Sequence, residues 1–359
     1  MEGDVRIPDM GVFDEVVGGT VLTGKSPYVE CFDQSFKPAK ITESELLQCA
    51  SGARDAIVWS TRSSGDGVID DEVYNKTLAE VESGWLRGPI APADLPSHAI
   101  VNRRFGIKQT SGDATKVRLI DDFSASGVNS TVQVSSMPKL HTLDIVAALS
   151  LELTRPPLDC SWVGKTVDLS SANRQLGISP QSEHVSYLSV FNPSSKKPEV
   201  FLMRALPFGE SRSVYSFLRV AHSLWWLGCV ALHLPWSSFF DDFITFSRDI
   251  ESEVVAGVIS QFFRLLGWLI SSGGKDLPFS PVFKALGVEI SLVECHLGNV
   301  IFRNTTRRVE ELVCAITSIL DKGQMTQAEA LSLGENAICK GSDMGRGCQV
   351  MLDDRPCLW

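Results

Sequence analysis

The sequence lacks the features of several protein classes. Nine Cys occur in 359 residues, but no C-x-x-C or C-x-H pair is found among them, so neither a zinc module nor a disulfide framework is expected. The most apolar stretch covers only residues 224–232, well short of the roughly 20 residues that span a bilayer. The N-terminus, MEGDVRIPDM, has no apolar core of a secretory signal. These absences predict an intracellular protein, cytoplasmic or nuclear, that is not secreted and has no transmembrane segment.

An excess of positive charge is also missing, because the net charge is −10. The deficit is local. Residues 1–100 hold 8 Lys and Arg against 17 Asp and Glu, a net of −9, which leaves 25 against 26, a net of −1, for residues 101–359. Basic residues gather at 103–118 and 303–308, although such small clusters usually form solvated surface. A nucleic-acid partner is therefore not excluded for the chain beyond residue 100.

Periodicity predicts a mixed α+β chain behind an acidic, loosely structured leader over residues 1–64. A helix is expected from about residue 70 to 87, and a hairpin with its turn at 110–113 should follow. A strand at 162–168 should lead into a helix capped by Ser170 or Ser171. The remaining expected elements are hairpins with turns at 192–197 and 241–242, β-structure at 279–292, and helices at 211–227, 254–271, 306–320 and 326–333.

A literal P-loop pattern occurs at residues 19–26, GTVLTGKS. The chemistry of a P-loop needs a buried strand before the pattern and a helix directly after it. Here Asp14 and Glu15 interrupt the strand, and Pro27 follows the pattern. A chance match is therefore expected rather than a nucleotide-binding loop.

Asp-Asp pairs occur four times, and their flanks distinguish them. Only Asp241-Asp242 lies between two runs of β-forming residues, FF and FITF, which would place two carboxylates at a tight turn. Asp168 ends a separate strand. If the two strands are neighbours, three carboxylates meet there, and such a set can hold two Mg²⁺ or Mn²⁺ ions that activate a hydroxyl nucleophile. Solvated acids at a turn are the alternative.

A series of motifs in this order resembles that of reverse transcriptases. It is most similar to the retrotransposon branch, and its motif sequences are most similar to those of DIRS-like elements. The series is KVRLIDDF from Lys116, DLSSANRQL from Asp168, LPFG ending at Gly209, FFDDFITFS around Asp241, and then Lys275 and Leu286-Gly287. The resemblance covers about residues 70–335. It implies a right-hand polymerase fold with fingers, an antiparallel-sheet palm and a partial helical thumb.

The resemblance also assigns roles to individual positions. Asp168, Asp241 and Asp242 would be the catalytic metal ligands for two Mg²⁺ or Mn²⁺ ions, and Lys275 would be a general acid toward pyrophosphate. The residues expected to bind the dNTP substrate are Lys108, Arg118, Asn173, Phe208 and Gly209. Asn173 departs from the family, which usually has an aromatic ring there to exclude the ribose 2′-hydroxyl. A small amide leaves the preference for deoxynucleotides open.

The domains expected on this basis are fingers at 65–160, a palm at 161–290 with a fingers insertion at about 176–200, a thumb fragment at 291–345 and a tail at 346–359. The expected activity is RNA-directed DNA polymerase, a nucleotidyltransferase, on an RNA or DNA template with a primer. Other polyprotein domains, such as a ribonuclease H, a recombinase or an integrase, are possible partners. Two alternatives stay open, namely a decayed retroelement fragment that only binds nucleic acid and an RNA-templated RNA polymerase.

Overall fold

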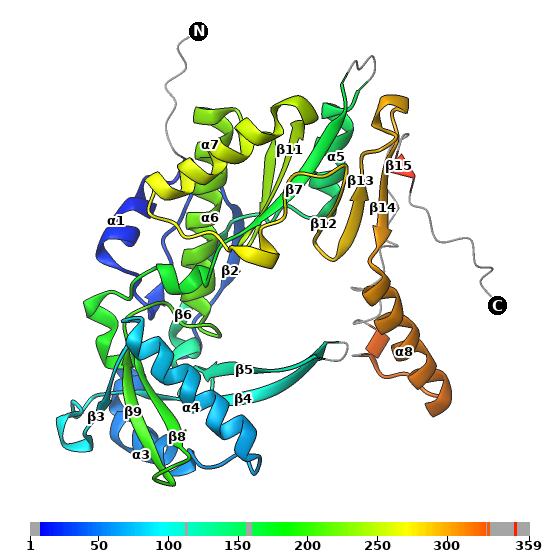
Figure 1. Ribbon diagram of the computed structural model, residues 1–359. Coiled ribbons are helices and arrows are strands. Elements are labelled where there is room, and N and C mark those ends of the chain that lie inside the picture. Colours follow the sequence, from blue (N-terminus) through cyan, green and yellow to red (C-terminus); the bar gives the residue numbers. More distant parts are fainter. Residues whose placement is uncertain (1–7, 112–113, 156–159, 328, 331–347, 350–359) are drawn as a thin grey trace. The chain divides into compact units, whose positions relative to one another are not determined.

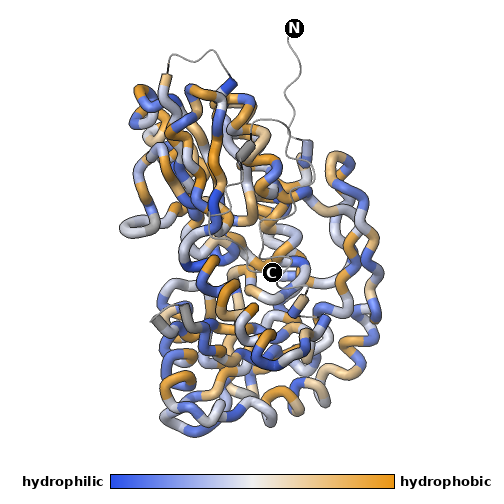
Figure 2. The backbone as a smooth tube through the Cα atoms, turned by 90° about the vertical axis from the view of Figure 1, so that its right-hand side faces the viewer, coloured by the Kyte–Doolittle hydropathy of each residue, from blue (hydrophilic) through white to orange (hydrophobic). Residues whose placement is uncertain are grey.

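A computed structural model describes residues 8–111, 114–155, 160–327, 329–330 and 348–349 (Figure 1). The chain divides into two compact units. Unit 1 contains residues up to 139 together with 171–226, and unit 2 contains residues 140–170 together with those from 227 onward. None of the described helices is long and apolar enough to cross a membrane. Apolar and polar segments instead alternate along the backbone (Figure 2).

Unit 1 is built around a five-stranded sheet with the strand order β3-β9-β8-β4-β5. Its long hairpin, β4 with β5, is antiparallel from Arg103 opposite Asp122 to Ser111 opposite Ala114. The helices α3 and α4 pack on this sheet, where apolar residues such as Val101 and Leu202 form a core. The element bounds are α3 (Ala50–Ser60), α4 (Gly67–Glu82), β3 (Leu86–Ile90), η1 (Pro92–Asp94), β4 (Val101–Ser111), β5 (Ala114–Asp122), β8 (Tyr187–Asn192) and β9 (Lys197–Met203).

A second, three-stranded sheet of unit 1 has the order β1-β6-β2. Val132 and Val134 of β6 pack against Tyr215 of the long helix α6. The elements of this part are α1 (Gly11–Gly18), β1 (Gly24–Lys25), β2 (Asp33–Lys37), α2 (Glu43–Gln48), η2 (Val128–Thr131), β6 (Val132–Met137), η3 (Ala172–Gln175), η4 (Pro180–Val185) and α6 (Ser211–Leu232). A 3₁₀ turn, η3, therefore stands where the sequence predicts a helix after residue 168.

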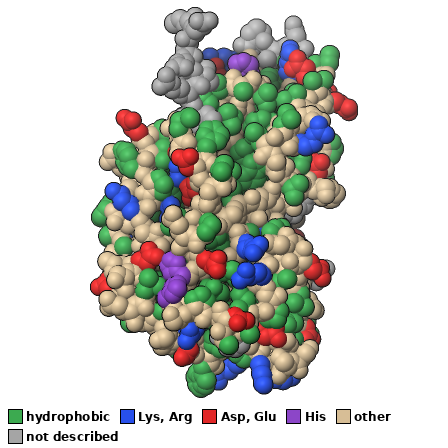
Figure 3. All heavy atoms as spheres, turned by 90° about the vertical axis from the view of Figure 1, so that its left-hand side faces the viewer, with side chains coloured by type: hydrophobic (Ala, Val, Ile, Leu, Met, Phe, Trp, Pro, Cys, Tyr) green, Lys and Arg blue, Asp and Glu red, His purple; other side chains and the backbone are tan. Residues whose placement is uncertain are grey.

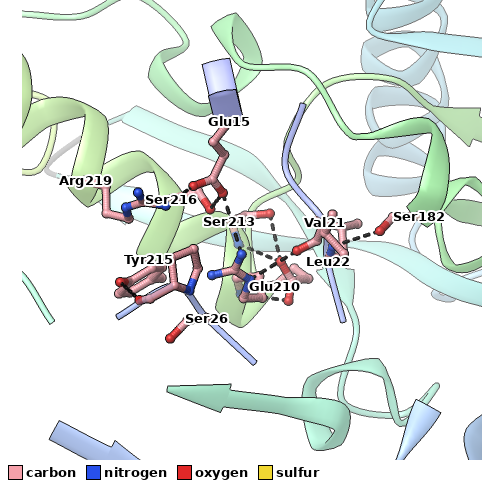
Figure 4. Close-up of polar contacts among 12 residues, drawn as sticks. Glu15, Val21, Leu22, Ser26, Ser182, Glu210, Ser213, Tyr215, Ser216 and Arg219 are labelled. Atoms are coloured by element: carbon pink, nitrogen blue, oxygen red, sulfur yellow. Dashed lines mark hydrogen bonds and ion pairs between the residues drawn. The ribbon is translucent and has the colours of Figure 1, made fainter. Parts of the chain in front are cut away.

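The leader is not loosely structured from residue 8 onward, which corrects the expectation from sequence. Arg219 of α6, fully buried, donates two hydrogen bonds of 2.7 Å to the carboxylate of Asp9 and also pairs with Glu15 of α1. Ser216 donates to the same Glu15 carboxylate (Figure 4). The acids that suggested a solvated segment thus neutralise an arginine some 200 residues away, a pairing that local periodicity does not reveal.

The P-loop pattern is engaged in the fold, as expected for a chance match. Gly24 and Lys25 form β1, which pairs in parallel with β6. The amide of Ser26 donates to the carbonyl of Gln133 at 2.7 Å, and that of Leu22 donates to Ser182 Oγ at 2.9 Å. No helix follows the pattern among the residues described there, so these amides form no phosphate cradle.

Glu210 caps the start of α6 from a fully buried position. Its carboxylate accepts hydrogen bonds from the backbone amides of Arg212 and Ser213 and from Ser213 Oγ (Figure 4). Burial nevertheless raises the pKa of Glu210 to about 7. Because the folded state holds this proton more tightly than the unfolded chain does, the contribution to stability is largest below about pH 4.5 and is lost as the pH rises to about 7.

Glu210→Gln should remove this pH dependence. From pH 5 to pH 8 the wild type should lose stability relative to the variant by up to about 3 kcal/mol, since one pKa unit corresponds to about 1.4 kcal/mol. Thermal melts of both proteins at half-unit pH intervals measure the difference. A gap in melting temperature that stays constant over this range would contradict the assignment.

Unit 2 contains an antiparallel three-stranded sheet, a four-stranded sheet in which only the β14–β15 pair is parallel, and the helices that cover them. One sheet has the order β10-β11-β7, and the other has the order β12-β13-β14-β15. Ile244 and Phe246 of β11 share a core with Val146 of α5 and Phe283 of β12. The elements are α5 (Leu143–Leu153), β7 (Trp162–Asp168), β10 (Trp236–Phe239), β11 (Asp242–Arg248), η5 (Asp249–Glu251), α7 (Ser252–Leu265), η6 (Gly273–Lys275), β12 (Val282–Ala285), β13 (Val288–Ser291), η7 (Cys295–Leu297), β14 (Val300–Asn304), α8 (Thr306–Lys322) and β15 (Cys348–Gln349).

Helix α7 covers the β10–β11 hairpin through an aromatic cluster. Phe263 is fully buried, and its ring centroid lies 5.2 Å from that of Phe243 and 6.0 Å from that of Trp236. Apolar side chains such as Leu265 remain exposed on this helix, and Figure 3 shows exposed hydrophobic side chains among polar ones. The helix expected at 326–333 lies partly outside the described residues.

Candidate active site

Two of the predicted carboxylates are cross-strand neighbours. In the antiparallel pair β7–β11, Asp168 lies directly opposite Asp242. Directly opposite residues have Cα atoms about 4.5–5.5 Å apart, and their side chains leave the same face of the sheet. The 239–246 hairpin therefore lies next to the 162–168 strand, which is the condition under which the sequence lets the three carboxylates meet.

Asp241 lies at the same end of the strand pair. Phe239 pairs with Asp242, so Phe240 and Asp241 form a two-residue turn, in which Phe240 has the positive φ of 51° that few non-glycine residues adopt. The carbonyl of Asp241 accepts a hydrogen bond of 3.1 Å from the amide of Leu169. Three acidic residues from two strands are thus brought to one sheet end.

A segment that follows α7 runs along the open edge of β7. The amide of Ser170 donates to the carbonyl of Leu269 at 2.9 Å, and the amide of Ser271 donates to the carbonyl of Asp168 at 2.7 Å. Farther along, Gly164 and Ser280 exchange two backbone hydrogen bonds of 2.9 and 3.0 Å. The chain between these two anchors forms a bulge that contains η6.

A cavity of about 320 Å³ adjoins the two opposite carboxylates. Asp168 and Asp242 line it together with Phe283, Lys284 and Gly274. Lys165 also lines it, and its Nζ donates to Asp276 Oδ1 at 2.6 Å. Lys165 and Lys284 were not found from the sequence, because a single lysine in a β-strand carries no pattern that separates it from surface.

Lys275 ends η6, directly after the cavity-lining Gly274, so the backbone places it beside this site. Its side chain lies outside the described part of the structure, and its expected role as a general acid stays a prediction.

The donor set of this site consists of carboxylate oxygens, which suit Mg²⁺ or Mn²⁺. Within the described residues, no three His, Cys, Asp or Glu side chains stand as a ready metal-binding group. Mg²⁺, however, usually keeps several waters and is held by only one or two carboxylates together with substrate phosphates. The opposite pair of Asp168 and Asp242 satisfies that smaller requirement.

The residues expected to bind a nucleotide belong to unit 1. In the β4–β5 hairpin, Lys108 lies opposite Val117, whereas Arg118 lies opposite Ile107. Because side chains alternate along a strand, Lys108 and Arg118 leave opposite faces of the hairpin. Lys108 instead forms an ion pair with Asp66.

Lys116 shares the face of Arg118, since the two residues are two positions apart on the same strand. Both side chains are exposed. Lys116 and Arg118 therefore form a pair of cationic side chains on one face of this hairpin. The sequence contains this i, i+2 spacing, and the structure shows that both residues belong to one regular strand.

Asn173, Phe208 and Gly209 lie around one buried arginine. The guanidinium of Arg174 stands 5.9 Å from the centroid of the Phe208 ring and donates to the carbonyl of Leu206 at 3.3 Å. Asn173 is 6% exposed, whereas Phe208 is 53% exposed. Gly209 has φ +90°, and a Cβ there would lie 2.7 Å from the carbonyl oxygen of Asp121, so this position requires glycine.

A buried ion network fixes this part of unit 1. Arg104 donates to both carboxylate oxygens of Asp121, at 2.6 and 3.0 Å, and to Glu80 at 2.7 Å. Arg174 completes the network through Glu80 at 2.9 Å and Asp121 at 3.4 Å. The two guanidinium groups hold the pKa of Asp121 below its usual value even though burial opposes this.

Comparison with known proteins gives structural neighbours only. No protein-family model matches the chain, and no curated protein matches its sequence. Among solved structures, a foamy viral protease-reverse transcriptase in complex with double-stranded DNA matches with a TM-score of 0.53 and 14% identity. A foamy viral protease-reverse transcriptase in complex with an RNA/DNA hybrid matches with a TM-score of 0.51 and 12% identity.

The chain has a reverse transcriptase-like fold. The matches cover 94% and 85% of this chain but only 53% and 34% of the two foamy viral chains, so it spans about half of the first and a third of the second. At these identities the reverse transcriptase likeness concerns the fold. The likeness of fold does not test the resemblance of the motif sequences to DIRS-like elements.

Proposed function

We propose that this protein is a nucleotidyltransferase that carries out template-directed DNA synthesis. The observation that carries the proposal is the placement of Asp168 directly opposite Asp242, with Asp241 at the adjoining turn, within a reverse transcriptase-like fold. The foamy viral neighbours are complexes with double-stranded DNA and with an RNA/DNA hybrid, which supports a nucleic-acid partner here. The template would be RNA or DNA, and the duplex would be held through its backbone.

In this proposal Asp168, Asp241 and Asp242 hold two Mg²⁺ or Mn²⁺ ions. When bound, such ions favour ionisation of the primer 3′-hydroxyl and neutralise charge on the leaving pyrophosphate. The protein's own contribution is positional, because the β7–β11 register fixes two of the acids on one face. Lys275 beside the cavity would supply the proton to pyrophosphate.

In this proposal, elements of the two units have different roles. The β10-β11-β7 sheet with α7 would form the palm, the β4–β5 hairpin the fingers, and α8 part of a thumb. The cationic face of the fingers hairpin, Lys116 with Arg118, would bind the triphosphate of the incoming dNTP. Phe208, Gly209 and Asn173 would contact its base and sugar.

Primer extension with Mg²⁺ on poly(A) annealed to oligo(dT) tests the proposal. We expect incorporation of dTTP that depends on template, primer and metal. Omission of each component and chelation of the metal are the controls. Template-independent addition, or binding of the duplex without extension under Mg²⁺ and Mn²⁺, would contradict polymerase activity, and the second result would favour a decayed nucleic-acid-binding fragment.

Asn173→Tyr should increase the preference for deoxynucleotides over ribonucleotides by at least ~10-fold. A ring at this position would collide with a 2′-hydroxyl that the smaller amide tolerates, and a steric block of this kind exceeds the ~1–3 kcal/mol that separates substrates differing by one methylene. Single-nucleotide incorporation of dATP and ATP by both proteins gives the ratio. Because Asn173 is buried, a thermal melt of the variant must accompany the assay.

Two results would contradict this role of Asn173. A wild type that already excludes ATP strongly, or an unchanged ratio in a folded variant, would show that the residue does not contact the sugar. Efficient ATP incorporation together with poor dATP incorporation by the wild type would favour an RNA-templated RNA polymerase.

A further inference from the structure

We infer that Ser271 is a positioning residue that orients the carboxylate of Asp168 for metal binding, an inference that rests on the proposed function. Ser271 Oγ donates a hydrogen bond of 2.6 Å to Asp168 Oδ2. The two residues are 103 positions apart, and Ser271 lies outside the motifs that suggested the catalytic acids.

The hydroxyl is presented by a fixed backbone. The same serine donates its amide to the carbonyl of Asp168 at 2.7 Å, and the preceding Ile270 forms an antiparallel bridge with Leu169. The amide of Ser170 then donates to the carbonyl of Leu269. Ser271 therefore reaches Asp168 from a short strand-like segment, so the hydrogen bond requires little ordering of a free side chain.

A carboxylate needs such a partner to keep one orientation. The terminal torsion of an aspartate is broad, so the carboxylate plane rotates readily unless a hydrogen bond fixes it. A hydrogen bond to a charged acceptor is stronger than one between neutral groups, and loss of an outer partner of a metal ligand typically weakens metal binding by about 10–100-fold. Ser271 thus acts through Asp168 rather than on the substrate.

The same segment anchors a second group at the cavity. Beyond Ser271 the chain passes through η6 to Asp276, which pairs with Lys165 of β7. The bulge that carries Gly274 and Lys275 is therefore held at one end by Ser271 on Asp168 and farther along by Asp276 on Lys165. Loss of the Ser271 hydroxyl leaves the second anchor and the backbone hydrogen bonds in place, so the fold should survive the substitution.

The experiment compares Ser271→Ala with two matched variants. Ser271→Thr keeps a hydroxyl at the same position, and Ser272→Ala removes the hydroxyl of the exposed neighbouring serine. The first readout is Mn²⁺ binding to the free full-length protein, which does not need catalysis. Binding is measured as the decrease of the electron paramagnetic resonance signal of free Mn²⁺. The Mg²⁺ dependence of primer extension is the second readout.

Ser271→Ala should weaken Mn²⁺ binding and raise the half-saturating Mg²⁺ concentration by about 10–100-fold, with much of the rate restored at high Mg²⁺. Ser271→Thr and Ser272→Ala should behave like the wild type. A folded Ser271→Ala protein with unchanged Mn²⁺ affinity would overturn the inference, as would a wild type that binds no Mn²⁺.

The two readouts separate this inference from the proposed function. If the wild type binds Mn²⁺, and Ser271→Ala weakens that binding although no extension occurs, the positioning role stands while polymerase activity fails. If the wild type extends primers and Ser271→Ala changes neither readout, polymerase activity stands and the positioning role fails.

Discussion

Asp168→Asn should lower the rate of primer extension by at least ~100-fold while it changes duplex binding little. The substitution keeps the size of the side chain and removes a charge that, in the proposed mechanism, would bind the metal ions, and such ions would supply most of the stabilisation of the transition state. Steady-state extension of a labelled primer gives the rate, and a gel-shift titration with the same duplex gives the affinity.

Asp249→Asn is the matched control for this prediction. The residue is exposed in η5, beyond the opposite end of β11, so the same chemical change there should leave extension within about twofold of the wild type. An Asp168→Asn protein that extends primers at a normal rate would show that the acids only form a solvated turn.

The β7–β11 register also predicts how a variant with both Asp168→Asn and Asp242→Asn should behave. Asp168 and Asp242 lie opposite each other and would bind the same ions. Removing the second charge after the first should therefore lower the rate of primer extension hardly any further. Extension by the protein that carries both Asp168→Asn and Asp242→Asn should therefore equal that of the slower single variant. Multiplicative losses would mean that the two acids act independently.

The placement of the three acids at one sheet end could be predicted from sequence because their signals are local. A strand of alternating pattern ends at Asp168, and the β-forming flanks of Asp241-Asp242 define a tight hairpin that the structure confirms. Strand periodicity fixes which side chains share a face once a register is known. The register itself depends on which strands pair, and for Lys108 and Arg118 the hairpin separates the two residues that the sequence had grouped.

Long-range partners could not be predicted, since nothing local marks them. Ser271 follows an amphipathic helix and has no spacing that links it to Asp168. The acids at Asp9 and Glu15 indicate a solvated leader until Arg219 is placed beside them. Composition assigned the arginines at 103–118 to solvated surface, which is wrong for Arg104, 2% exposed.

Arg104→Ala should destabilise the protein by about 3–5 kcal/mol. The guanidinium is fully buried, and its ion pairs with Asp121 at 2.6 Å and Glu80 at 2.7 Å offset the free energy of removing its charge from water. Without it, Asp121 and Glu80 must share Arg174, and breaking a buried network by removal of one partner leaves uncompensated charge. Urea unfolding of wild type and variant measures the change in the free energy of unfolding.

The adjacent Arg103→Ala provides the control, because the sequence position and the chemistry of the change are nearly the same. The side chain of Arg103 is 37% exposed and lies 3.7 Å from Asp122, and such a partly solvated pair contributes only about 0–1 kcal/mol. Equal losses for the two variants would show that the network around Asp121 contributes no more than a surface pair. A much larger loss for Arg104→Ala, together with weaker binding of dNTP by the folded fraction, is expected because this network links α4, the β4–β5 hairpin and the residues around Phe208.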